Sequence, residues 1–254
     1  MALKNQSLIL YNFTVTPANS SIDFRNAPSG PIIQATIKLG FYSLSTLLSA
    51  IAAALVSADP DNEYFATADR TIAGNTQNRV TISTLGTHFE LLFGTGPRVA
   101  SSIAPYIGFN PSDYTGSTTY TGSSTSGTVL IPDYPGYNYL GPEFNQKNFG
   151  VVNVSASGQK EAVVFALQQF ITVTFKFEQQ NKWITQWLPL VQWMIQQQQF
   201  DFTPDYTQPD VFYSVTLESS EADGQGLAFM PTEMLPDFPF YYDTGEMRFR
   251  IQPS

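Results

Sequence analysis

Hydrophobic and polar residues alternate along much of the chain, which is the pattern of half-buried β-strands. In the first half the alternation covers residues 8–15, 21–24 and 32–39. A turn-rich cluster separates the first two segments, and Gly40 ends the third. The pattern predicts a β-hairpin followed by a third strand.

One segment has a helical period instead. Five apolar residues recur at i, i+3, i+4, i+7 and i+11, namely Leu44, Leu47, Leu48, Ile51 and Leu55. This spacing places them on one helix face. Ser43 is a suitable N-cap and Asp59-Pro60 a suitable stop, so we expect a helix over residues 43–58.

Alternation then returns in residues 64–67, 79–83 and 88–93 and predicts three further strands. No charged residue occurs between Tyr114 and Pro132, and residues 118–128 are almost entirely Thr, Ser and Gly. Such a run has little to bury. We therefore expect a linker over residues 121–131, between an amino-terminal domain (1–120) and a carboxy-terminal domain (132–254).

The second half repeats this organisation. Strand patterns cover residues 150–155, 161–178, 211–218 and 246–251. A predicted helix over residues 183–199 carries one apolar side, formed by Trp183, Trp187, Val191, Met194 and Ile195. A single apolar stripe favours a core role for both tryptophans over a sugar-binding role.

The predicted fold class is mainly β (α+β). It has two tandem antiparallel β domains, each a sheet or sandwich with one packed helix. A second topology stays open, in which the first module is inserted between an amino-terminal strand at residues 8–15 and the sheet of the second half.

Composition narrows the class of protein. Hydrophobic residues reach 43% and aromatic residues 14%, whereas charged residues are 13% against roughly 25% in an average domain. The net charge of −9 and 12 scattered basic residues argue against nucleic acid and anionic membranes as partners. No apolar run is long enough for a membrane helix and no signal peptide is recognised, so we expect synthesis in the cytosol and a soluble protein.

Catalytic chemistry has few candidates. Cysteine is absent, which excludes disulfides and thiolates, and His88 is the single histidine, interpreted as an ordinary strand residue. Residues 94–98 (Gly-Thr-Gly-Pro-Arg) fit a turn better than a phosphate loop, since the Lys-Ser/Thr ending is missing. Asp201, Asp205 and Asp210 lack the EF-hand pattern. We expect no enzyme, and no catalytic, cofactor-binding or metal-binding residues.

Three tyrosines form the best binding candidate, in a loop rich in proline and glycine: Tyr134, Tyr137 and Tyr139. Exposed aromatic rings stack on sugars or anchor protein interfaces. The alternative is that these rings pack onto their own domain, and both interpretations stay open.

Three segments resemble a module of tailed-bacteriophage virion proteins that covers roughly residues 20–120. They are residues 39–48, residues 91–94 and residues 102–116, and the third includes Gly108-Phe109 and Asp113-Tyr114-Thr115-Gly116. The second half resembles distal tail proteins in its order of elements: strand 170–178, tryptophan-bearing helix 183–199, aromatic-aspartate strand 200–205 and strand 212–218. The resemblance implies a ring at the end of the tail tube, a hexamer, and no catalytic residues.

We therefore predict a non-enzymatic structural subunit of a tailed-phage virion, assembled in the host cytoplasm. Its expected place is a tail-tip or distal tail ring that joins the tail tube to host-recognition parts. The expected partners are copies of itself, other tail proteins and a host surface glycan. A carbohydrate-binding or receptor-adhesion module, and a neck or capsid-decoration protein, are the alternatives, and a virion-borne glycan hydrolase comes third.

Overall fold

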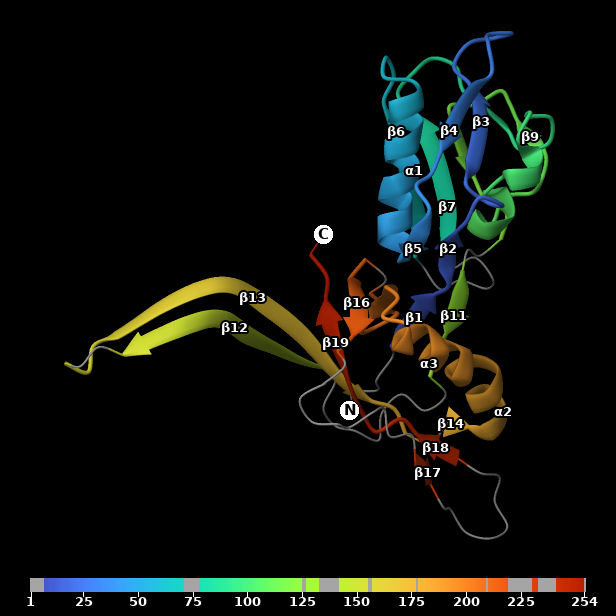
Figure 1. Ribbon diagram of the computed structural model, residues 1–254. Helices are drawn as coiled ribbons and strands as arrows, with labels where there is room; N and C mark the ends of the chain where they lie inside the picture. Colours follow the sequence, from blue (N-terminus) through green and yellow to red (C-terminus); the bar gives the residue numbers. More distant parts are fainter. Residues whose placement is uncertain are drawn as a thin grey trace. The chain divides into compact units, whose positions relative to one another are not determined.

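The computed structural model contains about twice as much strand (41%) as helix (20%), which confirms the mainly β fold class. The chain forms two compact units (Figure 1). The amino-terminal unit is built from Leu8–Leu130 and Gln198–Ser214, and the carboxy-terminal unit from Ile131–Gln197 and Val215–Pro253. The structure describes residues 7–70, 78–124, 127–132, 142–154, 157–176, 178–208, 210–218, 230–232 and 241–253.

The amino-terminal unit contains four groups of antiparallel strands. One is β4-β3-β8-β9, from Ile33–Thr36, Ser21–Arg25, Glu90–Leu92 and Asp113–Tyr114. The second is β10-β7-β6, from Thr119–Thr121, Arg79–Thr84 and Tyr64–Asp69. β2 (Phe13–Val15) pairs with β5 (Gly40–Tyr42). β1 (Leu8–Tyr11) lies between β11 (Thr128–Leu130) and β15 (Phe200–Thr203).

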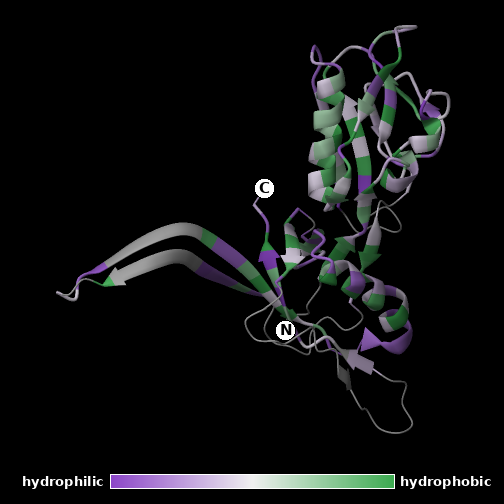
Figure 2. Ribbon diagram, viewed as in Figure 1, coloured by the Kyte–Doolittle hydropathy of each residue, from purple (hydrophilic) through white to green (hydrophobic). Residues whose placement is uncertain are grey.

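The main helix, α1 (Leu44–Ala58), confirms the prediction for residues 43–58. Its five periodic leucine and isoleucine residues are all buried, and α1 packs against β6 and β4. Figure 2 shows hydrophobic residues recurring along this helix. The Ser43 hydroxyl accepts from the Thr46 amide, and the Thr46 hydroxyl accepts from the Ser43 amide. This capping box fixes the start of α1.

An aromatic cluster fills the core beneath the sheets. The rings of Phe24 and Tyr64 meet edge to face at 5.3 Å, and Phe89 lies 5.4 Å from Tyr64. A second group contains Phe93, Phe109 and Tyr114 at 5.2–6.1 Å. The aromatic residues of Gly108-Phe109 and Asp113-Tyr114 are thus packing residues, since edge-to-face ring pairs stabilise a core.

The predicted linker over residues 121–131 is wrong. Thr119–Thr121 pairs with β7, and Thr128–Leu130 pairs with β1. The Tyr120 ring is buried, and its hydroxyl donates to the Phe89 carbonyl over 2.8 Å. β-branched threonines fit strands well once a partner strand supplies the hydrogen bonds. The Thr/Ser/Gly run therefore belongs to the amino-terminal unit.

The two units are not consecutive along the chain, unlike the predicted tandem domains. β15 lies in the second half of the sequence but belongs to the amino-terminal unit. Residues 8–10 of β1 pair with residues 201–203 of β15. The amino-terminal strand thus takes a partner from the second half, as the inserted topology proposes. The unit is completed by the returning segment Gln198–Ser214.

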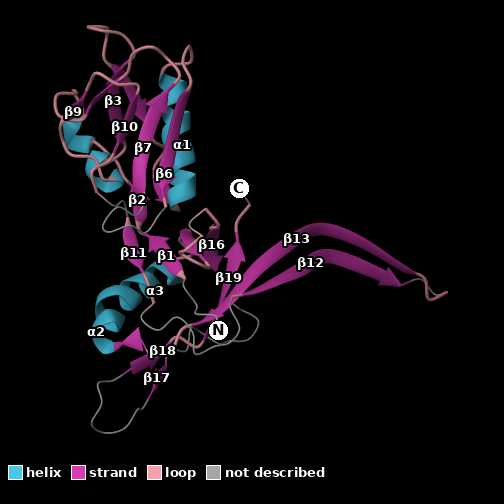
Figure 3. Cartoon of the chain, turned by 180° about the vertical axis from the view of Figure 1, so that it is seen from behind, coloured by secondary structure: helices cyan, strands magenta, loops and turns pink. Residues whose placement is uncertain are grey.

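The carboxy-terminal unit contains the antiparallel strands β16-β19-β13-β12, from Tyr213–Leu217, Glu246–Ile251, Lys160–Thr174 and Glu143–Val154. A small sheet, β14-β18-β17, is formed by Glu178–Gln179, Tyr241–Asp243 and Met230–Thr232. Figure 3 shows its helices, α2 and α3, in cyan. β12 begins at Glu143, earlier than the predicted strand at residues 150–155.

The second helical segment begins earlier and ends earlier than predicted. It comprises α2 (Gln180–Lys182), a π-helical turn (Trp183–Trp187) and α3 (Leu188–Ile195), with Pro189 in the first turn of α3. The predicted continuation to Gln199 is wrong, because Gln196 is the C-cap and Gln197 has a positive φ of 57°. A run of glutamines offers no apolar face that would extend the helix.

Trp187 confirms its predicted core role. Its side chain is fully buried and lies 5.2 Å from Phe175, while its indole N–H donates to the buried Glu178 carboxylate over 3.0 Å. Trp183 is half-buried, and its ring stacks on Trp187 at 6.3 Å and on Tyr242 at 5.1 Å. The Trp183 ring therefore belongs to an aromatic cluster of its own unit.

Candidate functional site

The most distinctive feature of the carboxy-terminal unit is a long two-stranded hairpin, here called the arm, formed by β12 and β13. The two strands pair from Glu143↔Thr172 at the base to Val154↔Lys160 at the tip. Among the described strands, β13 also pairs with β19, over Phe170–Thr174. The rest of the arm is a ribbon of two strands, which Figure 1 shows as a long curved extension.

A register shift between Phe149 and Gly150 interrupts the arm. Such a bulge adds one residue to one strand, and it bends and twists the ribbon locally. In this hairpin the extra residue is Phe165 of β13, since Ala166 pairs with Phe149 and Val164 with Gly150. The bulge accounts for the curvature of the arm.

The arm carries exposed apolar side chains. Phe144 is 53% exposed, Leu167 53% and Val154 60%. An isolated two-stranded hairpin is marginally stable in water, and it needs a further strand or a packed face to persist. The residue types along the outer half of β13 are also apolar, from Ala162 to Leu167. The arm therefore has the properties of a surface that another molecule covers.

The helical segment of the same unit presents a second apolar patch. Ile184, Leu188 and Ile195 are exposed, and their spacing of four and seven residues places them along one side of the helical segment. The adjoining side is buried through Trp187, Leu190 and Met194. The segment is thus apolar on two sides, which is unusual for a helix that faces only solvent.

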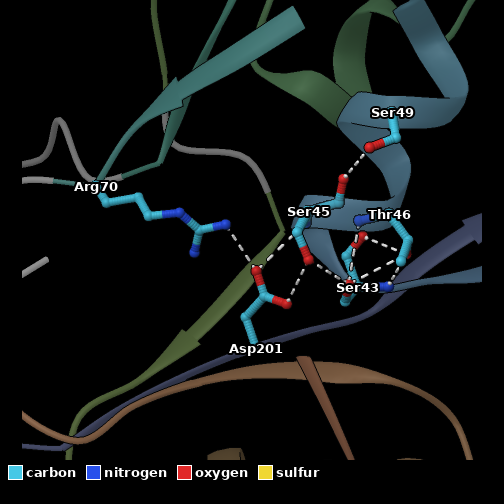
Figure 4. A network of polar contacts seen from close by, with 6 residues as sticks. All are labelled: Ser43, Ser45, Thr46, Ser49, Arg70 and Asp201. Carbon is cyan, nitrogen blue, oxygen red and sulfur yellow. Dashed lines mark hydrogen bonds and ion pairs between the residues drawn. The ribbon is translucent and has the colours of Figure 1, made fainter. Parts of the chain in front are cut away.

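A buried polar network lies inside the amino-terminal unit (Figure 4). The Asp201 carboxylate accepts from the Arg70 guanidinium over 2.8 Å, and from the Ser45 amide and hydroxyl over 3.3 Å each. Asp201 is fully buried and Arg70 nearly so. Burial raises the pKa of Asp201, although Arg70 and the hydrogen bonds act in the opposite direction.

This network attaches the returning segment to the start of α1. Ser45 is in the first turn of α1, where unpaired amides and the helix dipole favour a carboxylate. Arg70 also places its guanidinium 3.4 Å from the centre of the Phe212 ring. Two residues of the returning segment, Asp201 and Phe212, therefore hold Arg70. All these contacts lie within one unit, so we assign the network a structural role.

His88, interpreted from the sequence as an ordinary strand residue, lies just before β8, with its Nε2 3.2 Å from the Glu90 carboxylate. Glu90 also pairs with Arg25 over 3.4 Å. No group of three or more His, Cys, Asp or Glu side chains able to hold a metal ion is found in the described residues. His88 thus lies beside the Arg25–Glu90 ion pair, which joins β3 to β8.

The Gly94–Arg98 loop forms turns, as predicted. Its Gly94 and Thr95 amides donate to the Asp113 carboxylate over 2.7 and 2.9 Å, and Arg98 pairs with Asp23 over 2.8 Å. Burial acts to raise the pKa of Asp113, but the Thr95 hydroxyl and the two amides outweigh it, and the pKa is lowered. The Gly94 and Thr95 amides, which a bound phosphate would need as donors, therefore already donate to the Asp113 carboxylate.

The three aspartates at 201, 205 and 210 have different roles. Asp201 belongs to the buried network, whereas Asp205 accepts from the Thr207 amide over 2.9 Å in a turn. Asp210 is exposed. The interface or glycan candidates Tyr134, Tyr137 and Tyr139 lie outside the described residues.

Sequence reasoning missed both main features. The base of β12 reads Glu-Phe-Asn-Gln-Lys-Asn, which has no clear alternation, and the Arg70–Asp201 pair joins residues 131 positions apart. Searches against models of known families and against curated proteins find no match for this chain. In the described part of the chain, no helix has the length and hydropathy of a membrane span.

Proposed function

We propose that this protein is a non-enzymatic structural subunit of a tailed-phage virion that assembles with copies of itself into a closed ring. The tail tip is the place we favour, where the ring would join the tail tube to host-recognition parts. The single observation that carries the proposal is the arm, because its exposed strands need a neighbouring molecule to cover them.

The composition supports the same role. With 13% charged residues, the surface is polar without being strongly charged, which suits large permanent contacts. The exposed apolar residues of the helical segment offer a second contact surface. A closed ring needs two contact surfaces on each subunit, since every subunit touches a neighbour on either side. The arm and the helical segment meet that requirement.

The competing class, a carbohydrate-binding module, finds less support. Sugar platforms need an aromatic ring with one open face. The half-buried Trp183 ring stacks on two neighbouring rings, and Trp187 is fully buried. No described feature favours this class over an assembly subunit.

Mass spectrometry of purified virions, together with negative-stain images of the recombinant protein at micromolar concentration, tests the proposal. We expect the protein in stoichiometric amounts in virions and rings of uniform diameter in the images. A strictly monomeric protein that is missing from virions and binds an oligosaccharide would refute the proposal.

A further inference from the structure

We infer that two copies of this protein pair edge to edge through β12, antiparallel and centred on Asn145. The inference rests on the self-association in the proposed function and adds the contact surface and its register. It concerns the base of the arm, residues 143–147, where all five residues are exposed.

Among the described strands, β12 is an edge strand. It comes last in the strand order of its sheet, with β13 as its neighbour. In an antiparallel ladder every second residue directs its amide and carbonyl away from the existing partner. These groups form a template for a further strand, which natural proteins normally block.

Of the usual blocking devices, proline, a bulge and edge charges, β12 has only two charges, and they are of opposite sign. The strand contains no proline, and its charged residues are Glu143 and Lys147, both at the base. The single bulge of the arm places its extra residue in β13, on the opposite strand. The outer edge of β12 is thus regular at the position where a partner strand would add.

The charges on β12 favour a second copy of this chain as the partner. When two copies of β12 run antiparallel around Asn145, Glu143 of each copy lies opposite Lys147 of the other. Asn145 then faces its own equivalent, and Phe144 faces Gln146. Opposite charges on directly facing residues stabilise a strand pair, and like charges destabilise it. Pairing with a second copy of this chain therefore forms two Glu143–Lys147 ion pairs, one on each side of Asn145.

This two-fold contact uses the same surface on both copies. A ring that contains it alternates between arm pairs and a second kind of contact, so it has an even number of copies. The exposed Phe144 rings lie one position from the two-fold axis, and pairing covers part of their apolar surface. The contact thus buries part of the exposed base of the arm.

Cysteine cross-linking in the full-length protein tests the register, because the natural chain has no cysteine. In the inferred pair, the two Asn145 Cα atoms lie within the range that a disulfide bridges. We expect Asn145→Cys to form a disulfide dimer on mild oxidation. Gln146→Cys is the matched control and should cross-link at least about tenfold more slowly, because its equivalents are offset by two residues.

Charge reversal tests the partner. Glu143→Lys alone, and Lys147→Glu alone, should each weaken dimerisation on the order of tenfold, since both facing pairs become like-charged. The double reversal should restore it, because both facing pairs are again oppositely charged. Melting temperatures of all variants are compared with that of the natural protein.

The outcomes separate this inference from the proposed function. Oligomers that persist without a disulfide in Asn145→Cys, or that ignore both charge reversals, overturn the β12 pairing and leave the assembly role intact. A monomer at all concentrations overturns both. A disulfide in Asn145→Cys and a rescued double reversal support the pairing.

Discussion

Arg70 and Asp201 are 131 residues apart in the chain and form a buried ion pair of 2.8 Å inside the amino-terminal unit. The pair joins the end of β6 to a strand that returns from the second half of the sequence. Asp201 also accepts from the first turn of α1. One carboxylate therefore links three elements, and the returning segment is an integral part of this unit.

Removing Asp201 should strongly destabilise the amino-terminal unit. Asp201→Ala leaves the Arg70 charge buried beside Phe212, and breaking a buried ion pair in this way costs about 3–5 kcal/mol. Urea unfolding followed by circular dichroism measures the change, and the exposed Asp210→Asn serves as control. In an Arg70→Ala background the same substitution should cost much less, and equal costs would contradict a direct pairing.

Asp59 should contribute to acid sensitivity. Its carboxylate accepts from Tyr64, Asn26 and Asn62 over 2.6–2.9 Å. Burial acts to raise the pKa of Asp59, but these hydrogen bonds outweigh it and the pKa is lowered. Its contribution is therefore complete above the unfolded pKa of about 3.9 and is lost as the pH falls through the lower folded value.

Asp59→Asn should accordingly flatten the fall in unfolding free energy between neutral pH and about pH 3. Asp61→Asn, an exposed neighbour, should leave the slope unchanged. Asp201 has a raised pKa and acts with the opposite sign, so the comparison is made between variants and not on the natural protein alone. An unchanged slope in Asp59→Asn would contradict the assignment.

Trp187 should tolerate loss of ring size less well than Trp183 does. Trp187→Phe removes the indole donor to the buried Glu178 carboxylate, which costs about 1–3 kcal/mol. Trp187→Ala should cost about 3–5 kcal/mol. Trp183→Phe keeps a stacked ring and should cost less than either. Denaturant unfolding of the three variants measures the loss of unfolding free energy in each. A larger loss in Trp183→Phe than in either Trp187 variant would contradict the prediction.

Gly108 and Gly116 form a matched pair for testing a close backbone approach. Both have a φ of +81°, but a Cβ on Gly108 would lie 2.1 Å from the Ser124 carbonyl oxygen, whereas at Gly116 nothing lies within 4 Å. Gly116→Ala should cost about 1–2 kcal/mol for the left-handed backbone alone. Gly108→Ala should cost about 1–3 kcal/mol more because of the clash. Similar melting temperatures would refute the close approach.

The sequence predicted α1 well because its signals are local. The apolar period, the Ser43 cap and the Asp59-Pro60 stop all lie within one segment, and each agrees with the others. Trp187 was placed correctly for the same reason, since Val191 and Met194 on the same stripe are also buried, whereas Ile195 at its end is exposed.

The features that sequence reasoning missed depend on partners far along the chain. Residues 119–121 and 128–130 are strands because β7 and β1 supply hydrogen bonds, and the Thr, Ser and Gly residues between them give no alternation. The Arg70–Asp201 pair likewise exists only once β15 lies beside β1. The polar base of β12 is a strand because β13 pairs with it.

Sedimentation velocity tests the central claim, that this protein is an assembly subunit held through its arm, most directly. The full-length protein is compared at micromolar concentrations with a variant in which residues 150–165 are replaced by Asn-Gly, which joins the paired Phe149 and Ala166 by a two-residue turn. We predict a closed oligomer for the full-length protein and a folded species no larger than a dimer for the shortened variant, because that variant keeps residues 143–147. A full-length protein that stays monomeric, or a shortened variant that assembles equally well, would contradict the claim.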